Sequence, residues 1–278
     1  MSEPLDALAG DVKAAQGGDA GALDRVVRAV QNDVYRLAQR MLYLPADAED
    51  ATQEILVRVV TRLGSFEGRS RFRTWVYRVA ANHLLDFRRA RAEHGLSFDE
   101  YGEDLADGLT TEAPQHLRAP ELQVLRREVR LACTSALLMC LDRDHRLAYV
   151  LGVVFELAGP EAASILGIAP AAFRKRLSRA QQRVHAFLQT TCGRVAPDRA
   201  ACRCEHRIEA AVAQGRVDPE QLLFSQHPVA PGDGGVDAVV SRLERAVDAT
   251  TLMRAHPSYV ANDEVADGVL GLLRRSES

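Results

Sequence analysis

Four side chains that could bind a soft metal ion lie close together late in the chain. They are Cys192, Cys202, Cys204 and His206, with the spacing C-x9-C-x-C-x-H, and they include three of the five cysteines in the sequence. Three thiols and an imidazole match tetrahedral zinc in number and type, although structural zinc sites more often use pairs of C-x2-C. Arg203 and Arg207 flank the C-x-C pair and would favour thiolates. Metal binding, a redox-active pair and reduced structural thiols therefore all remain open.

The rest of the sequence has no constellation that predicts catalysis. Its eight histidines are scattered, and it contains neither a G-x-x-x-x-G-K-[ST] loop nor an H-E-x-x-H motif. The N-terminus lacks a basic and apolar leader, and the longest apolar stretch, 147–159, contains Glu156 and is too short to cross a bilayer. We expect a cytoplasmic protein that is not an enzyme, does not insert into membranes and requires no cofactor. Zinc or another soft metal at the cysteines is the exception left open.

Helical periodicity dominates the chain. Apolar stripes at 34–42, 55–63 and 72–87 each predict an amphipathic helix, and no convincing alternating strand is present. The 278 residues are 47% apolar and 5% aromatic, with a net charge of −3. This composition is typical of a soluble protein with a helical core. Any binding of nucleic acid must come from a local excess of positive charge.

The order of helical and broken segments predicts an all-α fold in four parts. Two small helical domains occupy 1–96 and 122–190. Between them, 97–121 has seven acids against one arginine and reads as an acidic linker. A helical C-terminal extension, with the cysteines at its start, covers 191–278.

A helix–turn–helix is predicted in the second domain. Ala163 allows a close approach of two helices, Gly167 closes the first in a left-handed turn, and Phe173 faces inward six residues later. Pro170 fits the first position of the second helix. From Ala171 to Arg183 there are five bases and no acid, which suits a helix in the major groove, although a solvated basic face is the alternative. The DNA-contacting candidates on this helix are Arg174, Lys175, Arg176, Ser178 and Arg179.

Two features of the first domain also predict binding. Asp50, Gln53 and Glu54 project from one helical face, as either a docking surface or a solvated acidic face. Residues 58–91 carry nine arginines against two acids, interleaved with aromatic side chains. Cations neutralise phosphates and aromatic rings stack on unpaired bases, so this pattern is typical of single-strand capture.

These motifs together resemble a known family. The stretch "DAEDATQEILVRVVTRLGSF" followed by "GRSRFRTWVYRVAANHLLDFRRARA" resembles region 2 of bacterial RNA polymerase sigma factors, in the extracytoplasmic-function (ECF) group of the sigma-70 family. The later stretch "AGPEAASILGIAPAAFRKRLSRAQQRV" is similar to region 4. The likeness covers roughly 20–190 in the family's order. It implies a factor that binds core polymerase, reads the −35 element and melts the −10 element.

The resemblance also implies roles for individual residues. Asp50, Gln53 and Glu54 would dock on the coiled coil of the polymerase β′ clamp, and the core partner would include the β subunit. Phe72 and Asn82 would help form a pocket for a flipped −10 base, whereas Trp75 on the apolar stripe is expected in the core. The arginines expected to follow the −10 backbone are Arg69, Arg71, Arg73, Arg78, Arg88 and Arg89.

Three questions stay open after this comparison of motifs. The acidic linker is either a disordered spacer or a segment that threads into basic channels of the polymerase. Ala171 and Ala172 stand where the family often has Gly-Thr, so promoter specificity is not defined. The extension is expected to regulate the factor, by inhibition or activation, with a merely stabilising role as the alternative, and a separate anti-sigma partner also remains open. The alternative function is a metal- or thiol-sensing DNA-binding regulator that works without polymerase.

Overall fold

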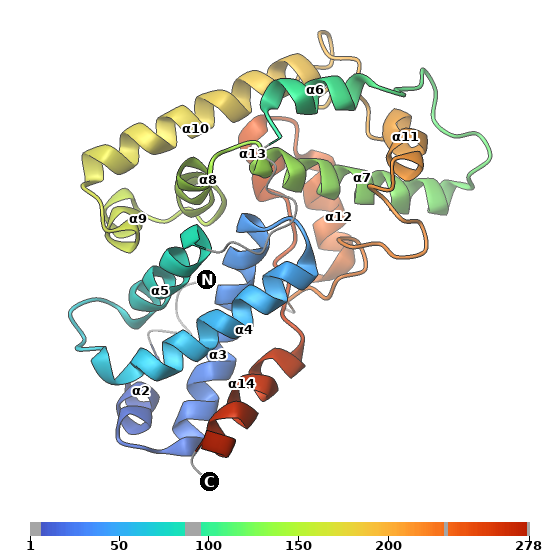
Figure 1. Ribbon diagram of the computed structural model, residues 1–278. Helices are drawn as coiled ribbons and strands as arrows, with labels where there is room; N and C mark the ends of the chain where they lie inside the picture. The colour runs from blue at the N-terminus through green and yellow to red at the C-terminus, as the bar shows by residue number, and fades with distance from the viewer. Residues whose placement is uncertain (1–6, 87–95, 231–232, 277–278) are drawn as a thin grey trace. The chain divides into compact units, whose positions relative to one another are not determined.

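The computed structural model describes residues 7–86, 96–230 and 233–276, and most of these residues lie in helices (Figure 1). An isolated bridge joins Cys192 and Cys202, and the described residues form no β-strand. The all-α prediction is therefore confirmed. Within the described residues no helix is long and apolar enough to span a membrane.

The chain forms two compact units, and each draws on separate parts of the sequence. Unit 1 takes the described residues of 1–90, 157–174 and 259–278, and unit 2 takes those of 91–156 and 175–258. The principal helices of unit 1 are α2 (Ala9–Gln16), α3 (Ala20–Met41), α4 (Pro45–Arg62), α5 (Phe72–Asp86), α9 (Gly159–Leu166) and α14 (Asp263–Ser276). Those of unit 2 are α6 (Phe98–Ala106), α7 (Ala119–Met139), α8 (Arg143–Tyr149), α11 (Ile208–Ala213), α12 (Gly235–Arg245) and α13 (Ala249–Arg254). Helix α10 (Pro170–Thr191) begins in unit 1 and continues in unit 2.

Helices α3 and α4 form the centre of unit 1. The side chain of Asp19 accepts a hydrogen bond from the Ala22 N–H at 2.8 Å and so caps α3, while Pro45 starts α4 with a fixed φ angle. Val34 of α3 and Ile55 of α4 are fully buried, as the apolar stripes predict. Each such side chain contributes about 1.5–3 kcal/mol when it leaves water.

Two helices from later in the chain complete unit 1. Helix α9 packs on α5, where the Arg78 guanidinium donates to the carbonyl oxygen and the hydroxyl of Ser164 at 3.1 and 2.9 Å. Helix α14 packs on α3 and α4. Unit 1 thus combines the predicted region 2 helices with the first helix of the helix–turn–helix and the last helix of the extension.

The segment predicted as an acidic linker contains a helix, α6, that the sequence analysis did not predict. Ser97 and Glu100 form a reciprocal capping box at its start, and Tyr101 and Leu105 bury its apolar side. The Tyr101 ring stacks on Phe187 of α10 with centroids 5.6 Å apart. The many acidic residues hid the apolar side of this short helix from the sequence pattern. A disordered spacer is therefore not a correct description of Phe98–Ala106.

The extension winds around α7 in unit 2. The buried carboxylate of Glu128 accepts hydrogen bonds from the N–H groups of Phe224 and Ser225 at 3.0 and 2.7 Å. The buried guanidinium of Arg130 donates to the carbonyl oxygen of Leu243 at 2.9 Å. Most of the extension is therefore bound into unit 2, and only its last helix belongs to unit 1.

Candidate functional site

The predicted polymerase-docking residues lie together on α4. Asp50 is exposed, whereas Gln53 and Glu54 are half-buried. The surrounding surface is acidic: burial and then the charge of Asp50 raise the pKa of both Asp47 and Glu49. The face therefore offers carboxylates that favour a basic partner.

Phe72, at the start of α5, belongs to a cluster of three aromatic rings. It is 6% exposed and stacks on Trp75 with centroids 5.8 Å apart, while Phe66 meets both rings edge-on or tilted at 5.3 and 5.6 Å. Trp75 is half-buried, so it is a partly covered wall of this cluster. Phe66 is not among the residues predicted from the sequence, although its place at the end of the quoted stretch "RLGSF" could have indicated it.

Asn82 does not share this cluster. It is exposed and lies ten residues beyond Phe72 on α5, which corresponds to about 15 Å along the helix axis. Helix α5 alone therefore does not bring the two predicted pocket residues to one point.

The arginines predicted to follow the −10 backbone divide into two groups. Arg69 and Arg71 are exposed, and Arg69 forms an ion pair with Glu67. Arg73 instead lies over the Tyr77 ring at 5.0 Å, with its Nε 3.9 Å from Asp33. Like Arg78, it is engaged inside unit 1. Arg88 and Arg89 lie outside the described residues.

The helix–turn–helix has the predicted geometry. Gly167 ends α9 with φ of 64°, the left-handed conformation that glycine adopts without strain, and Pro170 starts α10. Ala163 and Phe173 are each 1% exposed, so they pack inward as expected. All of these features confirm the prediction.

The basic helix α10 presents most of its predicted DNA-contacting side chains to solvent. Those that are exposed are Arg174, Lys175, Ser178 and Arg179. Arg176 is different, because it is half-buried and its Nη1 lies 2.7 Å from the Asp144 carboxylate. Farther along, the Arg183 guanidinium lies 5.2 Å from the Phe98 ring centroid and pairs with Asp142 at 3.7 Å. Most of the exposed cations of the helix thus lie in its first three turns, although Arg183 beyond them is also exposed.

The late cysteines lie against α7. The N–H of Gly193 donates to the carbonyl oxygen of Cys202 at 2.9 Å, and Cys202 has both Cys192 and Cys204 as electrostatic neighbours. Burial raises the pKa of the Cys202 thiol to about 12, and the neighbouring thiols add to this against a smaller opposing effect of Arg207 and Arg203. The flanking arginines do favour the thiolate at Cys202, as expected, but burial outweighs them and the pKa of that thiol rises.

The described residues near the late cysteines are not arranged as a set of metal ligands. Cys192, Cys202, Cys204 and His206 are all described, yet the described residues contain no group of three or more His, Cys, Asp or Glu side chains placed to hold a metal ion. The main-chain oxygen of His206 accepts hydrogen bonds from the N–H and hydroxyl of Thr110. These residues do not fit a metal site as placed, and binding of zinc or another soft metal stays a prediction.

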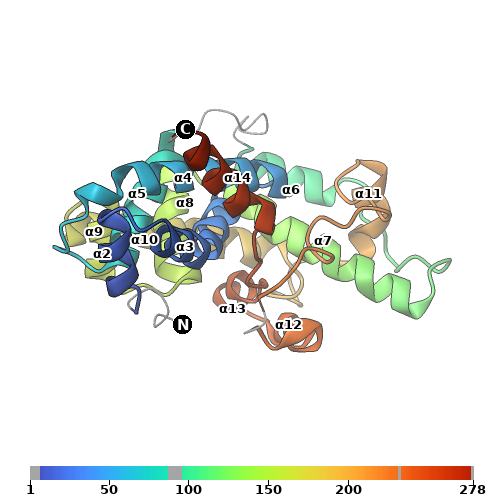
Figure 2. The ribbon, with the colours of Figure 1, turned by 90° about the horizontal axis from the view of Figure 1, so that it is seen from below.

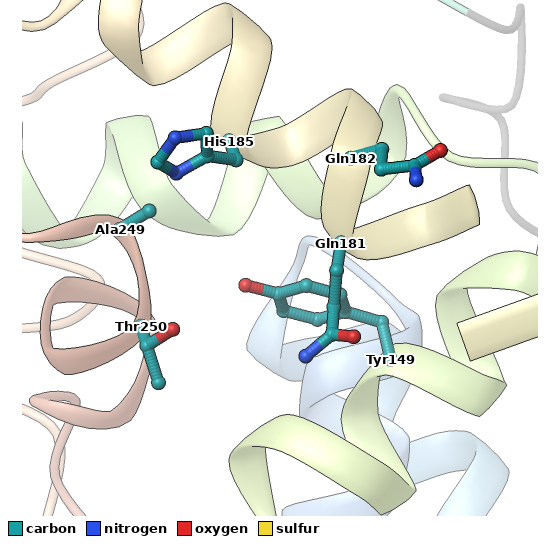
Figure 3. Close-up of a pocket in the computed structure, with 6 residues that line it drawn as sticks. All are labelled: Tyr149, Gln181, Gln182, His185, Ala249 and Thr250. Carbon is teal, nitrogen blue, oxygen red and sulfur yellow. The ribbon is translucent and has the colours of Figure 1, made fainter. Parts of the chain in front are cut away.

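A small pocket of about 260 Å³ lies within unit 2 between α10 and α13 (Figure 3). Gln181 and His185 of α10 face Ala249 and Thr250 of α13, and the Tyr149 ring lies behind Gln181. None of the residues predicted to contact polymerase or DNA lines it.

The chain is similar in sequence to known proteins. Residues 26–94 match the family model "Sigma-70 region 2". The chain is 29% identical to the RNA polymerase sigma-H factor of Pseudomonas aeruginosa, over 64% of this chain and 92% of that protein. It is 31% identical to the ECF RNA polymerase sigma factor SigE of Mycolicibacterium smegmatis, over 67% of this chain and 70% of that protein. A solved structure of CnrH in complex with the cytosolic domain of CnrY matches 64% of this chain at 24% identity, with a TM-score of 0.45.

An all-helical protein with relatives of this kind is a transcription initiation factor. The chain belongs to the ECF group of the sigma-70 family of RNA polymerase sigma factors. Members of this family direct promoter-specific initiation and are not enzymes. Nothing among the relatives favours a regulator that works without polymerase.

Proposed function

We propose that this sigma factor binds core RNA polymerase through α4 and reads promoter DNA with α5 and α10, in the cytoplasm where polymerase works. One observation carries the proposal: the first turns of α10, directly after a glycine-closed turn, present exposed cationic and hydroxyl side chains. This is the part of a recognition helix that meets base edges in the major groove.

The chemistry of α10 suits reading of the −35 duplex. Arg174 and Arg179 can each donate two hydrogen bonds to a guanine edge, and Ser178 can donate to or accept from any base. Lys175 adds a cation for a phosphate. Arg176, already paired with Asp144, would instead orient the helix.

Melting of the −10 element would use the exposed arginines near α5. Arg69 and Arg71 can neutralise phosphates of the separated strand, and exposed Asn82 can hydrogen-bond an unpaired base. Unpairing costs a few kcal/mol per base, which these contacts would offset. The factor would act through binding free energy alone.

Docking on polymerase would use the carboxylates of α4. Asp50 is exposed and Glu54 is half-buried one turn later, so both can meet a basic surface such as the clamp coiled coil of β′. A contact with the β subunit and a separate anti-sigma partner remain predictions of the family resemblance.

The test is transcription in vitro with core polymerase and the full chain. Asp50→Ala should weaken core binding, whereas Arg174→Ala should leave core affinity unchanged and reduce promoter-specific transcripts. Asn82→Ala should slow open-complex formation with little effect on core binding. Glu220→Ala, an exposed acid in unit 2, is the control for loss of a surface charge. Equal core affinity and equal transcription for Asp50→Ala would contradict the docking role of α4.

A further inference from the structure

Helix α14 packs its apolar side against α3 and α4 (Figure 1 and Figure 2). Val265, Ala266, Val269 and Leu270 recur at helical spacing and are each at most 9% exposed. On the same helix Leu272 is 47% exposed. The helix is therefore amphipathic, and its buried side is covered within unit 1.

The packing reaches the predicted docking residues. A Cβ atom added at Gly268 would lie 3.1 Å from Nε2 of Gln53, which is closer than ordinary van der Waals contact. The backbone of α14 therefore passes directly over the Gln53 side chain. A residue with a larger side chain at 268 would push against the amide of Gln53.

Polar contacts fix the direction of α14 on the unit. The Arg28 guanidinium of α3 lies 2.6 Å from the Asp267 carboxylate, and Asn32 accepts a hydrogen bond from the Ala261 N–H at 3.0 Å. Arg28 and Asp267 have side-chain exposures of 42% and 60%, and exposed pairs of this kind contribute little to stability because solvent screens their charges. The apolar contacts are thus the main source of stability for this packing.

We propose that α14 is an internal cover of the α4 docking face, so that core polymerase and α14 compete for Gln53 and its surroundings. The proposal rests on the docking role of α4 proposed above. With α14 in place, no partner helix can lie along α4 at Gln53, because the backbone around Gly268 already occupies that position. The bound form of this factor must therefore release α14.

The charges on the two helices favour a cover that can be released. Glu264, in the first turn of α14, lies near enough to Glu49 to raise the pKa of that carboxyl, after the larger effects of burial and Asp50. Like charges across the contact weaken it. Asp50 remains exposed beside the covered Gln53, so polymerase can make a first contact before α14 leaves.

The experiment measures core affinity of full-length variants. Val269→Asp places a charge in the covered side of α14, and Leu272→Asp makes the same kind of change on the exposed side of the same helix. Val269→Asp should bind core at least about tenfold more tightly than the wild type, because apparent affinity scales with the fraction of open molecules. Leu272→Asp should bind like the wild type. If the Val269→Asp variant is folded by circular dichroism but binds core polymerase no more tightly than the wild type, the proposal that α14 covers α4 is wrong.

A second measurement needs no substitution in α14. Hydrogen exchange of the wild type should show protected amides in 265–272 of the free protein and a loss of that protection when core polymerase binds. Protection that persists in the complex would overturn the proposal. Adding Asp50→Ala to the Val269→Asp variant tests the docking role of α4 separately from the covering of α4 by α14. If the double variant loses the gained affinity, docking on α4 stands; if neither variant nor wild type binds core, both proposals fail.

Discussion

Nε2 of His83 lies 3.6 Å from the Glu54 carboxylate, so the predicted −10 helix α5 and the predicted docking helix α4 meet at an ionisable pair. His83 is 6% exposed. Burial and the nearby charge of Arg58 lower the pKa of His83, and Glu54 opposes them only in part. The contact between α4 and α5 therefore contains a histidine, His83, whose pKa is lowered.

Stability of the protein should fall in mild acid because of His83. Its pKa in the folded state lies below the ordinary 6.5, so the unfolded chain takes up a proton first as the pH falls. The free energy of unfolding should be highest above pH 6.5 and should decrease below it. Urea unfolding at about pH 7.5 and about pH 5.5 measures this loss, which His83→Gln should reduce. The same change at exposed His116 should leave it unaltered, and an equal reduction by both variants would contradict the role of His83.

Substitution of Arg71 and substitution of Arg78 should have different effects on DNA binding. Arg71 is exposed, whereas Arg78 holds Ser164 of α9. Arg71→Ala should weaken binding to a single-stranded −10 oligonucleotide. It should also reduce the slope of log affinity against log salt concentration by about one, the amount expected for one lost phosphate contact. Arg78→Ala should leave the salt dependence nearly unchanged and lower the stability of unit 1 by about 1 kcal/mol. Titration of both variants against salt, with the exposed Arg199→Ala in unit 2 as the control, decides between these roles.

Arg174 and Arg176 make a matched pair on α10. Arg174→Ala should cost about 1–3 kcal/mol in affinity for a −35 duplex, because it removes an exposed side chain that can read a base. Arg176→Ala should change the affinity much less, because Asp144 already engages that guanidinium. Fluorescence anisotropy with duplex DNA measures both. A larger loss from Arg176→Ala would show that its pairing with Asp144 breaks in the complex.

Glu128→Ala should destabilise unit 2 by about 3 kcal/mol, because two N–H groups lose a charged acceptor in a buried place. Its carboxylate binds the N–H groups of Phe224 and Ser225, and Glu128 is 2% exposed. Chemical denaturation measures the change. Exposed Glu220→Ala should have little effect, and a similar loss in both variants would argue against a specific anchor at Glu128.

Local patterns in the sequence predicted much of this fold. The apolar stripes predicted α3, α4 and α5, and the spacing from Ala163 to Phe173 predicted the helix–turn–helix with its turn at Gly167. Periodicity and turn chemistry act over a few residues, so one sequence suffices to read them. Helix α6 was missed because its many acids obscured a short apolar side and a capping box.

The candidate site was less predictable because exposure depends on distant partners. Arg73, Arg78 and Arg176 look like Arg174 in the sequence, yet Asp33, Ser164 and Asp144 engage them. Along the sequence, Asp144 is 32 residues from Arg176 and Ser164 is 86 residues from Arg78. The raised pKa of Cys202 has a similar origin, because burial outweighs the arginines beside it.

The packing of α14 on α4 within one chain has a consequence for dosage. A regulator made as a separate protein covers its target only when its concentration is sufficient, whereas a tethered helix acts at a fixed effective concentration, up to about millimolar for a short flexible link. Cover and docking face are always made in equal number, however strongly the gene is expressed. Producing more of this protein would therefore raise its activity only in proportion, and a switch would require a ligand or partner that pulls α14 away.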